Sequence, residues 1–322
     1  MKDSEYIYAV ACIRTKEKNL LSDADIQTIA AMKDEKSIIN YLVDRGWGSR
    51  DTRTTEELLS LEEEKINALL YDLGVDHGII DVLSYPQQYH NLKTAIKQVC
   101  QGTSDPKAYY KSEKFNGEKM AAAIRSGNYA ELPEEMRELA EKTKAFLLET
   151  RDGQRCDFII DSACLSAMLA AAHKSKDAFL INYAETKVAT ADIKIAVRAC
   201  DTKRKRTYIE EALADCEAFK AKPLAEAASK GRDSVYAYLE KGGYPDAVAA
   251  MKESFSAFER WCDNHMMDTI IPQKHNIESS GPVVAFYLAR QNEIQMIRII
   301  TTAKANGFPD SAIQERVRKM YG

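Results

Sequence analysis

The sequence predicts an all-helical protein built from three similar domains. Glycine and proline number only 14 and 8 in 322 residues, which is less turn punctuation than a large β-sheet needs. Hydrophobic residues make up 45% of the chain and charged residues 29%, a balance typical of globular proteins. One order of segments occurs three times, and a chain of this length suits two or three cores.

The first part of each copy is predicted to be a short helix that ends at a glycine before an aromatic residue. The copies read IINYLVDRGW, MAAAIRSGNY and VYAYLEKGGY, and they end at Trp47, Tyr129 and Tyr244. Two apolar residues four positions apart mark one face of each helix. Glycine is the usual left-handed residue after a helix, and the aromatic ring beyond it can fold back into the core. We expect the ring of each aromatic residue, which we call the aromatic plug, to pack into the hydrophobic core of its own domain.

A long amphipathic helix is predicted after each aromatic plug, followed by an apolar segment and a helix with one buried stripe. The long helices are expected at residues 56–73, 133–150 and 246–267. Copies that start about 100 residues apart are domain-sized and too long for solenoid repeats. The predicted domains are residues 1–115, 116–205 and 206–322.

The striped helix that closes each copy carries the candidate functional residues. Its three occurrences read NLKTAIK, DIKIAVR and NEIQMIR, each with an amide or carboxylate six residues before a base. These polar groups either pair within a domain or face a concavity that a partner enters, and the sequence leaves both interpretations open. The candidate partner-binding residues are Asn91, Lys97, Asp192, Arg198, Glu293 and Arg298.

The C-terminal stretch shows how such a helix is bounded. Pro282 lies at a first-turn position, where its missing N–H costs little. Gly307 supplies a left-handed stop and Pro309 prevents continuation. Ser311 and Gln314 then predict a capping box for a last short helix. Pro86 is expected to break an earlier apolar helix, because proline lacks the N–H that a helix interior needs.

The sequence carries no motif that points to catalysis, a cofactor or a metal. It lacks the patterns GxxxxGK[ST], GxGxxG, HExxH and GxSxG. Its five histidines show no metal-ligand spacing, and its seven scattered cysteines contain no CxxC pair. Asp76-His77 is reminiscent of a dyad in helical phosphohydrolases, but no further member of such a site can be placed. We therefore predict no catalytic, cofactor-binding or metal-binding residue.

Charge and hydropathy predict a soluble protein that can lie against a membrane assembly. A net charge of −4 gives no field that favours nucleic acid. The longest apolar run, at residues 164–172, is far shorter than the roughly 20 residues that span a bilayer. Asp3 and Glu5 stand where a signal peptide would be basic. The basic run 203–206 is either a solvated helical segment or a contact for anionic lipid headgroups or an acidic partner.

The chain resembles the C subunits of the V-type and archaeal A-type ATPases, which are relatives of the eukaryotic d subunits. The resemblance rests on the pattern Y-x-Y-x-x-A-x-x-R from Tyr6 to Arg14. It rests most strongly on E-I-x-x-I-R-x-I, which starts at Glu293, followed by N-G-x-P from Asn306. The resemblance covers nearly the whole length, and the threefold repeat agrees with the architecture of that family.

The resemblance implies three helical domains arranged as a funnel with pseudo-threefold symmetry. The funnel would be a non-catalytic rotor part, joining the central shaft of subunits D and F to the membrane proteolipid ring. It would serve ATP-driven ion transport, such as hydrogen ion transport, or ion-driven ATP synthesis. The chain would be a single copy in a hetero-oligomeric complex, peripheral on the inner face of the cell membrane, with no cofactor, nucleic acid or transmembrane segment.

Two alternatives remain at this point. The first is a free-standing all-helical hydrolase that uses Asp76 and His77. The second is a general helical scaffold with no membrane complex.

Overall fold

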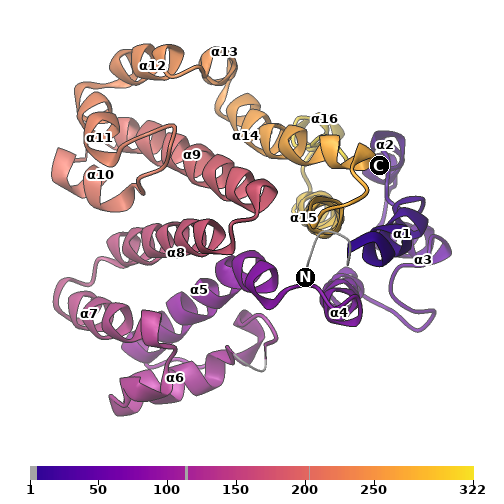
Figure 1. Ribbon diagram of the computed structural model, residues 1–322, viewed down its shortest axis with the longest axis horizontal. Coiled ribbons are helices and arrows are strands. Elements are labelled where there is room, and N and C mark those ends of the chain that lie inside the picture. Colours follow the sequence, from indigo (N-terminus) through magenta and orange to yellow (C-terminus); the bar gives the residue numbers. More distant parts are fainter. Residues whose placement is uncertain (1–5, 113–114, 203) are drawn as a thin grey trace. The chain divides into compact units, whose positions relative to one another are not determined.

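The computed structural model describes residues 6–112, 115–202 and 204–322, and helices are the only regular elements in those ranges (Figure 1). The all-α prediction is confirmed. Two compact units divide the chain: Met1–Ile79 with Asp177–Thr186 and Leu239–Gly322, and Ile80–Lys176 with Lys187–Tyr238. We refer to them as unit 1 and unit 2. The boundaries at residues 115 and 205 and the funnel arrangement stay predictions.

The helices of unit 1 come from both ends of the chain. They are α1 (Tyr6–Glu17), α2 (Asp23–Ala31), α3 (Glu35–Asp44), α4 (Thr55–Asp72), α13 (Pro245–Glu253), α14 (Phe255–Ile270), the 3-10 helix η4 (Ile271–His275), α15 (Gly281–Ala305) and α16 (Asp310–Gln314). Unit 2 contains the 3-10 helices η2 (Pro106–Ala108) and η3 (Tyr129–Glu131), with α6 (Gly117–Ser126), α7 (Glu134–Thr150), α8 (Gly153–Ser175), α10 (Arg206–Ala212) and α11 (Ala221–Lys230). Residues of both units belong to α5 (His77–Gln101), α9 (Ala178–Asp201) and α12 (Arg232–Lys241).

Helix α15 fills the centre of unit 1, with α1, α2 and α4 around it (Figure 1). Ile294, Ile297 and Ile300 are at most 1% exposed, as the predicted buried stripe requires. They pack in one cluster with apolar residues of α2, α3 and α4, among them Ile26 and Leu42. Burial of such a side chain stabilises the fold by about 1.5–3 kcal/mol. The C-terminal helix therefore completes the core of the N-terminal helices.

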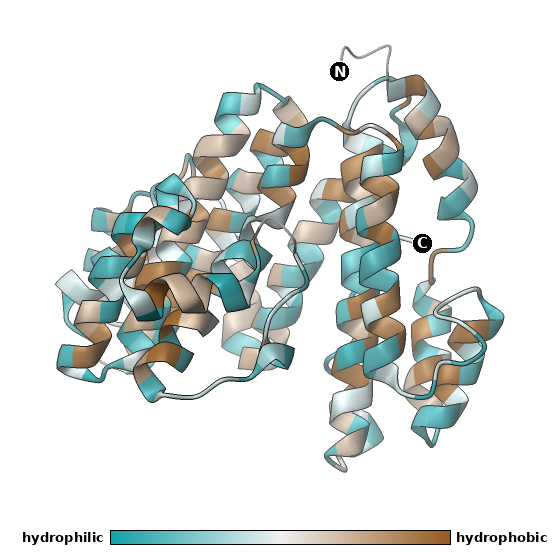
Figure 2. Ribbon diagram, turned by 90° about the horizontal axis from the view of Figure 1, so that it is seen from below, coloured by the Kyte–Doolittle hydropathy of each residue, from teal (hydrophilic) through white to brown (hydrophobic). Residues whose placement is uncertain are grey.

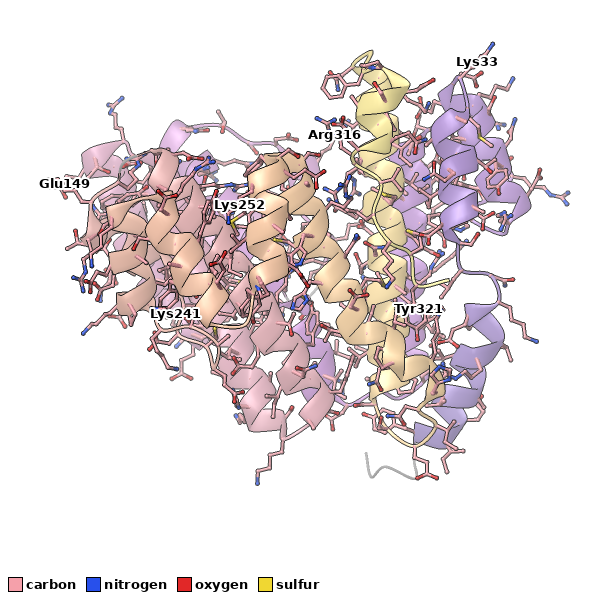
Figure 3. All side chains as sticks on the ribbon, turned by 90° about the horizontal axis from the view of Figure 1, so that it is seen from above. Lys33, Glu149, Lys241, Lys252, Arg316 and Tyr321 are labelled. Carbon is pink, nitrogen blue, oxygen red and sulfur yellow. The ribbon has the colours of Figure 1, made fainter. Side chains whose placement is uncertain are left out.

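The chain end returns to the first helices of unit 1. The backbone N–H of Met320 donates to Asp23 at 2.9 Å, and the hydroxyl of Tyr321 donates to Glu17 at 3.2 Å (Figure 3). Lys274 of η4 lies over the Tyr321 ring, with its Nζ 4.9 Å from the ring centre. Both chain ends of the unit are thereby held in one packed body.

The core of unit 2 repeats this plan with a different striped helix. Leu92 and Ile96 of α5 are fully buried among apolar residues of α6, α7 and α8. From α8 the cluster takes Cys156, Ile160 and Cys164, which are four residues apart and therefore share one face. Figure 2 shows apolar and polar residues side by side along most helices, as expected when one face is buried.

The predicted glycine stops are confirmed in all three copies. Gly46, Gly127 and Gly243 have φ values of 86°, 77° and 88°, a region that side-chain-bearing residues rarely adopt. Each lies just past the end of α3, α6 or α12. The backbone of Trp47 then donates to Leu42 at 3.0 Å, closing the end of α3. Trp47 is buried, whereas the rings of Tyr129 and Tyr244 are half-buried.

Three local predictions are wrong. Helix α5 runs through Pro86. Proline removes one backbone hydrogen bond from the helix, but the packing of buried residues before and after Pro86 offsets that loss. The segment 246–267 is two helices, since Ser254 is extended and its hydroxyl accepts from the N–H of Ala257 to start α14. Pro309, not Ser311, is the N-cap residue of α16, and no side chain caps that helix.

One helix in the described part of the chain, α8, is long and apolar enough to cross a membrane. The core helix of a globular protein passes the same test, so this observation carries little weight. One face of α8 lies in the unit 2 core, with Cys156, Ile160 and Met168 buried.

Candidate functional site

The first polar residue of each striped helix binds the backbone of a segment farther along the chain. Asn91 is fully buried; its amide donates to the carbonyls of Tyr110 at 2.9 Å and Phe115 at 3.0 Å. Its oxygen accepts from the N–H of Tyr110 at 2.8 Å. In the third copy the amide of Asn292 donates to the carbonyl of Lys319 at 3.2 Å. These residues hold returning segments against their helices.

Asp192 takes the same place in the second copy. One carboxyl oxygen accepts from the N–H of Ala214 at 3.1 Å. The other has no hydrogen-bond partner among the described residues, and the side chain is fully buried. Burial, with a smaller contribution from Asp215, raises the pKa of Asp192 to about 8. At neutral pH the protonated, uncharged form of this carboxyl therefore predominates, and it replaces the amide found in the other copies.

Glu293 lies in a buried charge network, which we call the Arg290 network. The guanidinium of Arg290 donates to both Glu293 and Glu62, and the other oxygen of Glu293 accepts from the N–H of Leu21. Arg290 also lies over the ring of Trp47, 4.2 Å from its centre. Burial raises the pKa of Glu293 to about 7, although Arg290 opposes the rise. The network joins α15 to α4 and to the segment before α2.

Glu62 extends the Arg290 network to the first glycine turn. Its second oxygen accepts from the N–H of Gly48 and from Nζ of Lys65, both at 2.7 Å. The side chains of Glu62, Glu293 and Arg290 are 5%, 2% and 11% exposed. Their charges are therefore stabilised mainly by one another and little by water. Neither Glu62 nor Arg290 was predicted from the sequence. The spacing of three between Arg290 and Glu293 was the available signal.

A cavity of about 450 Å³ adjoins the Arg290 network in unit 1. Its lining is mixed in charge, because Lys16, Arg45 and Lys65 face the same space as Asp72 and Glu62. Trp47 and Phe286 supply apolar surface.

The bases six residues beyond the first polar residues lie near the surface, and two of them, Lys97 and Arg298, pair within their own units. Lys97 contacts Asp157 of α8 with Nζ–Oδ2 2.8 Å, and its side chain is 33% exposed. Arg298 contacts Glu63 of α4 at 3.2 Å and is 34% exposed. Arg198 is exposed and lines a cavity of about 260 Å³ in unit 2. Such exposed pairs are worth about 0–1 kcal/mol, so these bases can exchange partners cheaply.

Asp76 and His77, the residues of the hydrolase alternative, are exposed at the start of α5. The Asp76 carboxylate accepts from the N–H of Gly78 at 2.8 Å, which lowers its pKa. No group of three or more histidine, cysteine, aspartate or glutamate side chains suited to a metal occurs in the described residues. The Asp76 carboxylate therefore caps the first turn of α5.

A family model described as "ATP synthase (C/AC39) subunit" matches residues 9–316. The chain belongs to this family. The match spans nearly the whole chain, and it confirms the resemblance that the first and last helices indicated. No curated protein matches the sequence. This ATP synthase (C/AC39) subunit is accordingly a component of a V/A-type ATP synthase, a membrane-associated complex.

Proposed function

We propose that this protein is a non-catalytic part of the central stalk and couples the shaft of subunits D and F to the membrane proteolipid ring. The observation that carries the proposal is the family match over residues 9–316. One copy on the cytoplasmic face would turn with the shaft, in ATP-driven ion transport or ion-driven ATP synthesis. Three related helical domains around a common axis would form its funnel.

The interior of each unit supports a mechanical role. Torque passes through a protein only if its helices do not slide past one another. The Arg290 network fixes α15 to α4, and Asn91 fixes α5 to the connector that follows it. Breaking a buried ion pair typically costs about 3–5 kcal/mol, and leaving a buried polar group unpaired costs about 1–3 kcal/mol, so both attachments resist deformation.

We assign partner contact to the exposed bases and internal support to the buried polar residues. Lys97, Arg198 and Arg298 retain exposed charge that a partner's carboxylates can reach. Asn91, Asp192 and Glu293 are at most 2% exposed, so their part in docking is to hold the surface in shape.

A reconstituted complex with and without this protein tests the proposal. ATP hydrolysis and ion transport are measured on the same preparation. We expect hydrolysis to continue without the protein while ion transport is lost. Transport at an unchanged rate in its absence would remove the coupling role. Phosphate-ester hydrolysis by the purified chain that disappears in His77→Ala would establish the hydrolase alternative instead.

Arg298→Glu tests the assignment of partner contact. We expect the variant to keep ATP hydrolysis and to transport fewer ions per ATP, because a reversed charge repels a carboxylate partner. Lys33→Glu is the matched control, since Lys33 is also exposed but lies on a loop after α2 (Figure 3). A melting curve for each variant separates lost docking from unfolding. Equal coupling in both variants would leave Arg298 with a packing role only.

A further inference from the structure

A cavity in unit 2 is lined by positively charged and hydroxyl-bearing residues and by no carboxylate. Its volume is about 350 Å³. It lies where α8 begins, α9 ends and α10 begins. We call it the Arg204 cavity, and its lining residues are Arg155, Thr202, Arg204, Lys205, Thr207 and Tyr208.

Two of the three cations of the Arg204 cavity keep their charge unneutralised. The guanidinium of Arg204 donates to the neutral amide oxygen of Gln154 and lies 4.8 Å from the centre of the Tyr208 ring. Lys205 is exposed and has no ion pair among the described residues. Arg155 is paired with Glu211 at 2.5 Å. The cavity therefore carries an excess of about two positive charges, which favours an anion.

Hydrogen-bond donors in this cluster also exceed the acceptors that the chain supplies. Nε of Arg155 and the hydroxyl of Tyr208 are buried and have no hydrogen-bond partner among the described residues. Buried polar groups normally have hydrogen-bond partners, so unpaired donors beside a cationic cavity indicate a ligand that supplies acceptors. The Tyr208 ring is fixed by an edge contact with Phe158, with ring centres 5.7 Å apart.

We propose that the Arg204 cavity binds a phosphate-bearing anion, either free phosphate or the phosphate of a lipid headgroup. A phosphate presents several oxygens in different directions, and the donors here reach the cavity from two segments of the chain, the start of α8 and residues 202–208. Arginine matches phosphate oxygens with two parallel N–H donors, while lysine adds a compact charge and the threonines add hydroxyls. This binding is independent of the proposed rotor function.

The basic run of the sequence contributes to the site in part. Arg204 and Lys205 line the Arg204 cavity, whereas Arg206 is directed to Glu226 at 3.6 Å and Glu210 at 4.0 Å. Lys203 lies outside the described residues. Arg206→Gln is therefore a matched control, because it removes one charge from the same run without touching the lining.

The test compares the full-length chain with the double variant Arg204→Gln/Lys205→Gln and with Arg206→Gln. Binding of inorganic phosphate is followed by titration calorimetry. Binding to phosphatidylcholine vesicles with and without phosphatidic acid is followed by co-sedimentation. We expect the double variant to lose about a hundredfold in affinity, since it removes two charged hydrogen bonds and each is worth about one factor of ten. Arg206→Gln should bind as the unaltered chain does.

The two arms distinguish the sources of phosphate. Calorimetric binding of phosphate that depends on Arg204 and Lys205 assigns a free ligand, and binding only to phosphatidic acid vesicles assigns a headgroup. The proposal is overturned if neither probe binds, or if the double variant and Arg206→Gln lose affinity equally. Equal losses would reveal a diffuse charge effect without a defined site. Melting curves confirm that each variant is folded.

Discussion

Asp192→Asn is the change that tests the interpretation of the striped helices most sharply. The substitution keeps the oxygen that accepts from the N–H of Ala214. It removes the proton equilibrium of a fully buried carboxyl whose pKa is raised to about 8 by burial. Asn91 shows that an amide is compatible with the equivalent position of the first copy.

The direction of the pH effect follows from proton binding. An ordinary aspartate has a pKa of 3.8, so the unfolded chain loses this proton near pH 4, while the folded chain keeps it to about pH 8. Between those values the folded state binds more protons, and stability therefore falls as pH rises. About one unit above pH 8 the carboxyl is ionised in both states, so the loss is complete and the curve becomes flat. From about pH 5 to pH 8.5, Asp192 alone removes roughly 4 kcal/mol of unfolding free energy.

Urea unfolding of the unaltered chain and Asp192→Asn at these two pH values measures the effect. We expect the unfolding free energy of Asp192→Asn, relative to that of the unaltered chain, to rise by roughly 4 kcal/mol from the lower to the higher pH. Asn91→Asp is the opposite control. The amide of Asn91 does not titrate, so this substitution should make the unfolding free energy fall with rising pH through a new carboxyl at position 91. A constant difference between the unaltered chain and Asp192→Asn at both pH values would refute the argument that Asp192 is neutral.

Two further predictions concern unit 1, one in its interior and one at an exposed helix end. Arg290→Met should lower the unfolding free energy by about 3–5 kcal/mol, because Glu62 and Glu293 would each lose the donor that pairs with one buried carboxyl oxygen. A loss no larger than that of Lys33→Met in urea unfolding would contradict this. Gly243→Ala should cost roughly 1–2 kcal/mol, since φ is 88° there while nothing lies within 4 Å of the added carbon, so the loss is purely conformational. Gly153→Ala, at an ordinary φ, is its control and should cost less in the same thermal melts.

Local patterns in the sequence predicted the features that depend on neighbouring residues. The glycine stops at Gly46, Gly127 and Gly243 follow from the backbone freedom of one residue type, and all three were predicted. The stripe of Ile294, Ile297 and Ile300 follows from helical periodicity. These features need no knowledge of which helix packs against which.

The features that the sequence did not predict depend on distant contacts. Arg290 and Glu62 are 228 residues apart in the chain, and no local pattern connects them. The continuity of α5 through Pro86 depends on packing around the proline. The charge state of Asp192 depends on burial and on a second oxygen without a partner, neither of which is visible in a sequence.

Rotation of this protein within the working complex is the most direct test of the central claim. The complex is held by its stationary part, and a visible probe is attached to the exposed side chain at position 33, as a Lys33→Cys variant. We predict that the probe rotates when ATP is added and stops when ATP is removed. A probe that stays fixed while the same complexes hydrolyse ATP and transport ions would contradict the assignment to the rotor.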